Sequence, residues 1–190
     1  RSRKTVRSIM FRPDMIKAIV EGKKTQTRRV IKPQPPATLL NPTLIARDPA
    51  SPSGYSFVSD EYGEIQLKSR YQVGEVYIKE AWAVNPTYDD LMPSQIPETA
   101  FVTYLNDKYN SFLIGKKRSP MFMPEWSARY FIRFYNIFPQ RAQEITLEQA
   151  IAEGFNSIQE FGEYIDRINP EKPYANNLWL WANEFKRVEK

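Results

Sequence analysis

The residues with the clearest potential for chemistry lie between Gly22 and Arg29, where the sequence reads Gly-Lys-Lys-Thr-Gln-Thr-Arg-Arg. A lysine that is crowded by other cations and partly removed from water has a lowered pKa, so Lys24 is a candidate base. A threonine hydroxyl beside such a base can act as a nucleophile, and this stretch offers Thr25 and Thr27. The same residues also fit a solvated basic turn that leads into a strand, with threonines suited to β-structure.

Positive charge is concentrated around this stretch. Residues 1–32 hold 11 Lys and Arg against Asp14 and Glu21, a balance of +9, whereas the whole chain carries +5. Residues 33–190 therefore carry −4, and the positive field belongs to the N-terminal sixth of the chain. Such a field favours an anionic or nucleotide-like ligand over a uniformly basic coat. The expected partner is a nucleoside or RNA.

The composition removes several kinds of chemistry. The chain has no cysteine and no histidine, which excludes disulfides, thiolate nucleophiles, Ser-His-Asp triads and sites ligated by cysteine or histidine. Catalysis would have to use carboxylates, Lys, Tyr, Ser, Thr or backbone dipoles. The acidic pairs lie in turn-like sequence, and we expect no metal site and no cofactor.

Two carboxylates could complement a basic residue. Glu80 lies in an apolar strand close to Trp82, where it would be buried. Glu153 is the last residue of a predicted helix before Gly154. A negative charge at this end of a helix is disfavoured by the helix dipole, so its presence there needs an explanation. An ordinary salt bridge is the alternative explanation for either residue. Among the tryptophans we expect most to lie in the core, and we expect Trp126, which follows Pro124 in a loop, to face a ligand and stack on a base.

The elements that must position these residues follow from periodicity and capping signals. Residues 13–21 predict a helix ended by Gly22, and capping boxes at 146–149 and 157–160 open two more helices. We therefore expect one α+β domain over residues 1–190, a mixed β-barrel of about six to seven strands with two or three short helices. Loop insertions are expected within 33–70 and 84–126, and residues 1–4 as a disordered tail. The expected strands are 6–11, 30–31, 55–58, 64–67, 76–82, 100–104, 128–138 and 178–188.

The pattern Gly22-x-Lys24-x-x-x-x-Arg29 resembles the signature of the ASCH domain, a member of the PUA-like superfamily that is built on a small β-barrel. Further blocks resemble the family in the same order: residues 9–22, 74–82 (Gly-Glu-Val-Tyr-Ile-Lys-Glu-Ala-Trp), 123–129, 145–154 and 177–188. The last three are similar to stretches of phage and prophage members. Together the blocks cover somewhat over half of the chain.

This resemblance implies a function directed at RNA or nucleotides. Small bacterial members with a similar core are amidohydrolases that remove the acetyl group from N-acetylated cytidine. Their working lysine, threonine and glutamate correspond to Lys24, Thr27 and Glu153, with Arg29 helping to hold the site. We therefore predict these three as catalytic residues. The predicted binding residues are Gly22, Lys23, Arg28, Arg29, Glu80, Trp82, Trp126 and Arg129.

The chain also departs from the small hydrolases. It is nearly twice their length, and the extra residues lie in the two insertions, which could cap or reshape a pocket. Glu125 stands where arginine is usual in the phage-type pattern. A non-catalytic module that binds RNA or a modified nucleotide, and a phage-associated interaction protein, are the alternative functions. No apolar run is long enough to span a membrane and the first residues lack the apolar core of a signal peptide, so we expect a cytoplasmic protein.

Overall fold

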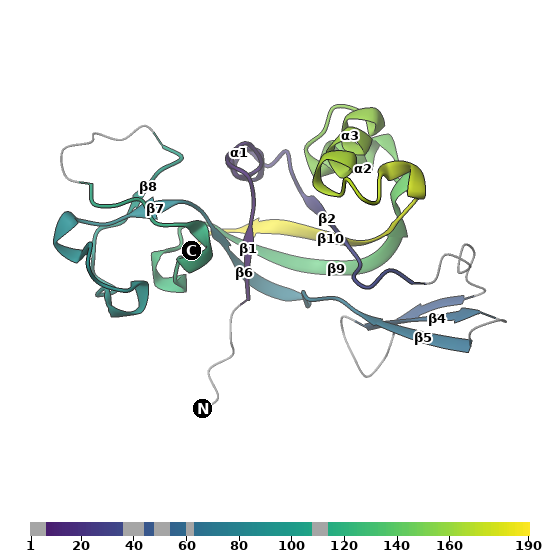
Figure 1. Ribbon diagram of the computed structural model, residues 1–190, viewed down its shortest axis with the longest axis horizontal. Coiled ribbons are helices and arrows are strands. Elements are labelled where there is room, and N and C mark those ends of the chain that lie inside the picture. The colour runs from purple at the N-terminus through teal and green to yellow at the C-terminus, as the bar shows by residue number, and fades with distance from the viewer. Residues whose placement is uncertain (1–6, 36–43, 48–53, 60–62, 108–113) are drawn as a thin grey trace. The chain divides into compact units, whose positions relative to one another are not determined.

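The computed structural model describes residues 7–35, 44–47, 54–59, 63–107 and 114–190, and it shows a mixed α+β protein (Figure 1). The chain divides into two compact units. Unit 1 comprises Arg1–Lys17, Glu75–Ile132 and Arg187–Lys190, and unit 2 comprises Ala18–Gly74 and Arg133–Lys186. The predicted α+β class is confirmed, and a single domain over the whole chain stays a prediction.

The largest sheet has five strands in the order β1-β6-β9-β10-β2. Strands β1 and β6 are parallel, whereas β10 and β2 are antiparallel, so the sheet is mixed. Within the ranges described above, the strand order is open and no closed barrel is formed, so the predicted barrel also stays a prediction. The strands are β1 (Arg7–Met10), β6 (Gly74–Lys79), β9 (Phe131–Arg141), β10 (Trp179–Val188) and β2 (Gln26–Val30).

The helix before the basic motif forms as predicted. Helix α1 (Pro13–Val20) begins at a proline, whose missing N–H is no loss in the first turn. At its end the N–H groups of Lys23 and Lys24 both donate to the carbonyl oxygen of Ala18. Gly22 has a φ of 73°, a left-handed conformation that a side chain would strain. This turn delivers Lys24 to the start of β2.

In unit 1 the segment 84–126, predicted as a loop insertion, has a core of its own. Trp82, Val84, Ile96 and Met123 are buried together, and Trp126 packs against them. The segment contains only short elements in its described part: a pairing of β7 (Trp82–Ala83) with β8 (Thr103–Tyr104) and short 3-10 turns. The 3-10 turns are Pro86–Tyr88, Pro93–Gln95, Pro120–Phe122 and Glu125–Ser127.

In unit 2 the predicted hairpin is confirmed. Strands β4 (Gly54–Ser59) and β5 (Gly63–Lys68) pair antiparallel, and β3 (Leu44–Arg47), which the sequence did not indicate, joins β4 on its other side. The hydroxyl of Tyr55 donates to the carbonyl oxygen of Ile137 on β9, and the Tyr55 ring contacts the indole of Trp181 on β10 at 5.8 Å between centroids. These contacts attach the hairpin to the long strands of the same unit. Residues 36–43 of the predicted insertion lie outside the described residues.

Helices α2 (Leu147–Glu153) and α3 (Ile158–Ile168) follow one another next to β2 in Figure 1. Thr146 and Gln149 form the predicted capping box, each side chain meeting the other residue's backbone N–H. Gly154 ends α2 with a φ of 98°, and Ser157 caps α3. In this way local capping signals set the end of α2, where Glu153 lies.

Candidate functional site

The site is built where the C-terminal end of α2 meets the start of β2. The backbone N–H of Thr25 donates to the carbonyl oxygen of Ala152 at 2.8 Å, and the backbone N–H of Arg28 donates to Glu153 Oε1 at 2.8 Å. Two backbone N–H groups, one just before β2 and one within it, therefore hold the last turn of the helix. The hydrogen bond from the Arg28 N–H explains why a carboxylate is found at the C-terminal end of the helix, where the dipole disfavours it.

Lys24 is buried, with 1% of its surface exposed. Its Nζ donates to the carbonyl oxygen of Gln26 at 2.8 Å and to the carbonyl oxygen of Glu153, and it lies 3.5 Å from Glu153 Oε1. Burial lowers the pKa of Lys24, since the charged form loses its hydration, and the charge of Glu153 only partly opposes this. Arg29 and Arg28 lower the pKa further. The direction agrees with the one expected from the sequence, but burial lowers the pKa more than the neighbouring cations do.

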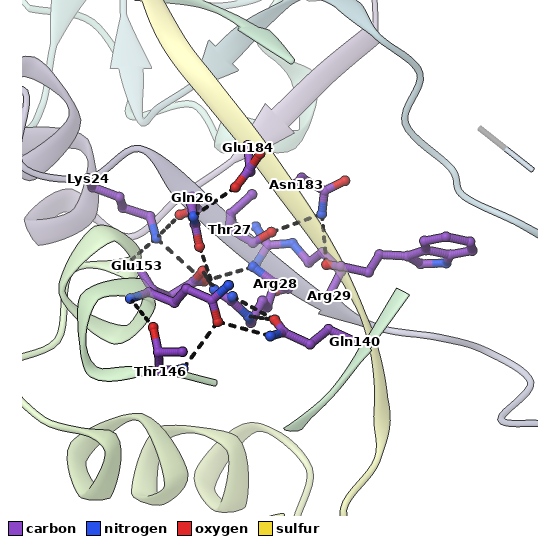
Figure 2. A network of polar contacts seen from close by, with 12 residues as sticks. Lys24, Gln26, Thr27, Arg28, Arg29, Gln140, Thr146, Glu153, Asn183 and Glu184 are labelled. Carbon is purple, nitrogen blue, oxygen red and sulfur yellow. Dashed lines mark hydrogen bonds and ion pairs between the residues drawn. The ribbon is translucent and has the colours of Figure 1, made fainter. Parts of the chain in front are cut away.

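Arg28 is the second cation of the site and is 3% exposed. Its Nη1 donates to Glu153 Oε2 at 3.1 Å and to Gln26 Oε1 at 3.0 Å, while Nη2 donates to Gln140 Oε1 at 2.8 Å. Burial lowers the pKa of Arg28, and the contacts with Glu153 oppose that effect. Figure 2 shows Lys24 and Arg28 meeting the same glutamate from two sides. Two buried cations thus share one carboxylate.

Thr27 lies on the opposite face of β2 from Arg28, because side chains alternate along a strand. It is 1% exposed, and its Oγ1 has no hydrogen-bond partner among the described residues. The structure therefore joins Lys24 to Glu153 but does not hydrogen-bond either of them to the Thr27 hydroxyl. The Thr27 carbonyl oxygen accepts from Asn183 Nδ2 at 2.9 Å on the neighbouring strand β10. The Thr27 backbone is therefore held by β10 while its buried hydroxyl makes no hydrogen bond within the described residues.

The resemblance assigned Arg29 the task of holding the site, whereas the structure places Arg28 against Glu153. Arg29 is on the other face of β2, half-buried, and its Nη1 approaches the carbonyl oxygen of Arg28 at 3.5 Å. Gln26 and Gln140 were missed by sequence reasoning. Gln26 alternates with Arg28 along the strand and could have been found from that spacing, but nothing local indicates Gln140. Gln140 also donates to Gln149 at 2.9 Å, which connects the site to the cap of α2.

The structure places the remaining predicted residues elsewhere. Gly22 and Lys23 are exposed in the turn, and Lys23 pairs with Glu21 at 2.7 Å. Trp82 is fully buried in the core of unit 1, and Trp126, expected to face a ligand, meets it edge-on at 6.2 Å between ring centroids. Trp126 is partly buried and contributes to this core cluster, so its position is that of a packing residue.

Glu80 and Arg129 form a separate ion pair in unit 1, in which Glu80 is buried and Arg129 is partly exposed. Arg129 Nε and Nη2 donate to the two oxygens of Glu80 at 2.8 and 2.9 Å, and Arg129 also pairs with Asp107. The guanidinium lies against the rings of Tyr104 and Tyr130, at 4.0 and 4.6 Å from their centroids. Burial lowers the pKa of Arg129, but the hydrogen bonds to Glu80 and Asp107 outweigh it and the pKa lies above its ordinary value. This geometry matches the salt-bridge alternative for Glu80.

Two further findings concern metal sites and membrane-spanning helices. No group of three or more Asp or Glu in the described ranges is placed to hold a metal ion. None of the helices in the described part of the chain is long and apolar enough to cross a membrane.

No family model matches the chain, and no curated protein matches it. Among solved structures the chain is similar to protein EF3133 from Enterococcus faecalis V583, described with the family model DUF984. The identity is 10% and the TM-score is 0.42, and the alignment covers 92% of this chain and 66% of the other. The chain thus spans about two thirds of that protein's length. At this TM-score the likeness carries no conclusion about fold family or activity.

Proposed function

We propose that this chain is an ASCH-type protein of the PUA-like superfamily that acts on a nucleotide or RNA in the cytoplasm. Its most specific proposed activity is hydrolysis of the amide bond of an N-acylated nucleoside, with Lys24, Thr27 and Glu153 as the catalytic residues. The proposal rests on one observation: Lys24, a buried lysine of lowered pKa, contacts Glu153, and Thr27, three residues after Lys24, has a buried hydroxyl with no hydrogen-bond partner among the described residues.

The charge balance of the buried cluster suits a neutral Lys24, whose Nζ donates to the carbonyl oxygens of Gln26 and Glu153 and lies 3.5 Å from Glu153 Oε1. With Lys24 neutral, Arg28 and Glu153 form a balanced ion pair, so the buried cluster carries no excess charge.

The proposed reaction is acyl transfer to Thr27. Lys24 takes the hydroxyl proton as Thr27 Oγ1 attacks the acyl carbonyl carbon, and Glu153 stabilises the resulting ammonium. The tetrahedral intermediate collapses, the C–N bond breaks, and the amine of the base leaves with the proton from Lys24. Lys24 then deprotonates a water that attacks the threonine ester, and the proton passes from Lys24 to Thr27 Oγ1 as the C–O bond to threonine breaks and the carboxylic acid is released. A nucleophile and a base are thus supplied without histidine or metal ligands.

The test is product analysis by liquid chromatography and mass spectrometry on a panel of N-acylated nucleosides. We expect wild-type protein and Thr27→Ser to release the free nucleoside, and Lys24→Met, Thr27→Val and Glu153→Gln to lose turnover by at least about 100-fold. Glu163→Gln, an exposed change on α3, is the matched control for the glutamate variant. Absence of turnover across the panel with folded wild-type protein would remove the hydrolase proposal.

A non-catalytic module is the second candidate, favoured by the burial of the motif. Lys24, Thr27, Arg28 and Glu153 are each between 1% and 3% exposed, as expected of residues that stabilise a fold. In that case the variants would change stability, and there would be no activity to lose. The same panel separates the two candidates, because only the hydrolase releases nucleoside.

A further inference from the structure

A hollow of about 500 Å³ in unit 2 is lined by an unusual concentration of cations. Five of its twelve lining residues are basic and none is acidic; the basic ones are Arg28, Arg29, Lys32, Lys68 and Arg70. Arg28 and Arg29 lie on β2, Lys32 lies two residues after it, and Lys68 and Arg70 lie at and just beyond the end of β5. Like charges brought together in this way repel each other, so the arrangement favours an anionic ligand that offsets the repulsion.

A second hollow of about 630 Å³ adjoins the first. The two share Val30, Lys32, Ile168 and Asn169 in their walls, and the second adds Lys172 together with one acidic residue, Glu171. Because they share these residues, the two hollows are neighbours, and we name the two together the basic groove. Each hollow has a volume typical of a site for a small organic ligand.

The cations of the basic groove differ in whether they already pair with other side chains of the protein. Arg28 is bound to Glu153 and Gln140. Lys32, Lys68 and Arg70 are exposed, and none of the ion pairs among the described residues includes them. The walls between the cations are partly apolar and aromatic, formed by Val30, Tyr71, Ile165, Ile168 and Trp181. Exposed cations beside an apolar wall suit a ligand that combines phosphates with a flat ring system.

We propose that the basic groove binds single-stranded nucleic acid through at least two successive phosphates. The two adjoining hollows argue for a strand rather than a single nucleotide, because cations lie along both of them, with Lys32 in their shared wall. Arg28 lines the groove and also holds Glu153, so it connects the groove to the proposed catalytic residues. The consequence for chemistry rests on the proposed function: the hydrolysed base would belong to a strand rather than to a free nucleoside.

Binding is tested by fluorescence anisotropy with a labelled single-stranded RNA of ten nucleotides that carries no acyl group. We expect log Kd to depend on log salt with a slope magnitude of about 2 to 3, since each phosphate contact on a single strand contributes about 0.7. Lys68→Gln, Arg70→Gln and Lys32→Gln should each weaken binding by about three- to tenfold at low salt and reduce the slope magnitude by about 0.7. Lys186→Gln, an exposed change on β10 outside the groove, is the matched control.

Three outcomes would overturn the proposal that the basic groove binds a nucleic-acid strand. Groove variants that bind as well as the Lys186→Gln control, or wild-type protein that does not bind RNA, would overturn the proposal. A nucleoside monophosphate that competes as well as the oligonucleotide would also overturn it, in favour of a single phosphate site. Labelled single-stranded DNA of the same sequence tells whether the 2′-hydroxyl contributes.

A last set of experiments separates RNA binding by the groove from the proposed hydrolase activity. Lys24→Met should retain RNA binding, because Lys24 does not line the groove. On an acylated oligonucleotide, Lys68→Gln should raise KM about three- to tenfold with kcat unchanged. RNA binding that depends on the groove, with no turnover on any substrate, would leave the groove standing and remove the hydrolase. Turnover of nucleosides without any RNA binding would support the hydrolase and remove the groove as an RNA-binding site.

Discussion

Both oxygens of the Glu153 carboxylate are bound by one residue, Arg28, through its backbone N–H at 2.8 Å and its guanidinium at 3.1 Å. The backbone donor belongs to β2 and cannot rotate away, so the strand sets the orientation of the carboxylate. Lys24 Nζ lies 3.5 Å from the same Oε1 that accepts from the backbone. The proposed base therefore faces a carboxylate whose position is fixed by the sheet, which is the arrangement that a preorganised proton-transfer site requires.

Removing the shared carboxylate should destabilise the protein strongly. Glu153→Ala leaves the Arg28 guanidinium buried without a counter-charge, and we expect it to lower the free energy of unfolding by about 3–5 kcal/mol. Glu153→Gln keeps the shape and an acceptor for the Arg28 N–H, so its loss should be smaller. Urea denaturation measures both, with Glu163→Gln expected to change stability by less than about 0.5 kcal/mol. Equal, small losses in all three variants would mean that the carboxylate does not hold the site.

The stability conferred by Lys24 should depend on pH in a defined direction. Its pKa in the folded protein lies below 10.5, so between these two values the unfolded chain binds a proton that the folded chain does not. Wild-type stability therefore rises with pH across this window. Lys24→Met removes the titrating group, and its free energy of unfolding relative to wild type should fall as pH rises towards 10.5. A difference that stays constant from pH 6 to 10.5 would contradict the lowered pKa.

Thr27→Val should separate stability from activity. The substitution preserves the β-branched shape and removes a buried hydroxyl that has no hydrogen-bond partner among the described residues. We expect the protein to be equally stable or more stable by about 1 kcal/mol, and inactive as a hydrolase. Thr27→Ser should retain activity. Thermal unfolding and the nucleoside assay measure the two effects, and full activity in Thr27→Val would exclude the threonine as nucleophile.

The Glu80–Arg129 pair should contribute to stability without contributing to hydrolysis. Arg129→Lys loses the two-pronged contact with Glu80 and the packing between two tyrosine rings, and we expect a loss of about 3 kcal/mol. Asp107, the other partner of Arg129, is exposed, so Asp107→Asn should cost less than about 1 kcal/mol. Chemical denaturation compares the two variants. A larger loss in Asp107→Asn would show that the buried contact is not the main one.

Much of the positioning of the site is readable from local sequence. Gly22 follows an apolar helical stripe and predicts the turn that delivers Lys24, and Thr146 with Gln149 predicts the cap that begins α2. Gly154 marks its end and so places Glu153 in the last turn. These signals are reliable because each acts over a few residues, through backbone hydrogen bonds and φ preferences that side chains nearby determine.

The sequence by itself determined which residues are chemically capable: a crowded lysine, threonines in a short strand, a glutamate at a helix end and no histidine or cysteine. Only the tertiary structure decided which of them meet. Arg28 rather than Arg29 binds Glu153, 125 residues away, because the pleat of β2 turns that side chain towards α2. Trp126 packs on Trp82 because Trp82 shares a core with described residues of the segment 84–126. The basic groove likewise joins residues 28–32, 68–71 and 165–169. Contacts over such separations depend on packing and strand pairing, which no local pattern encodes.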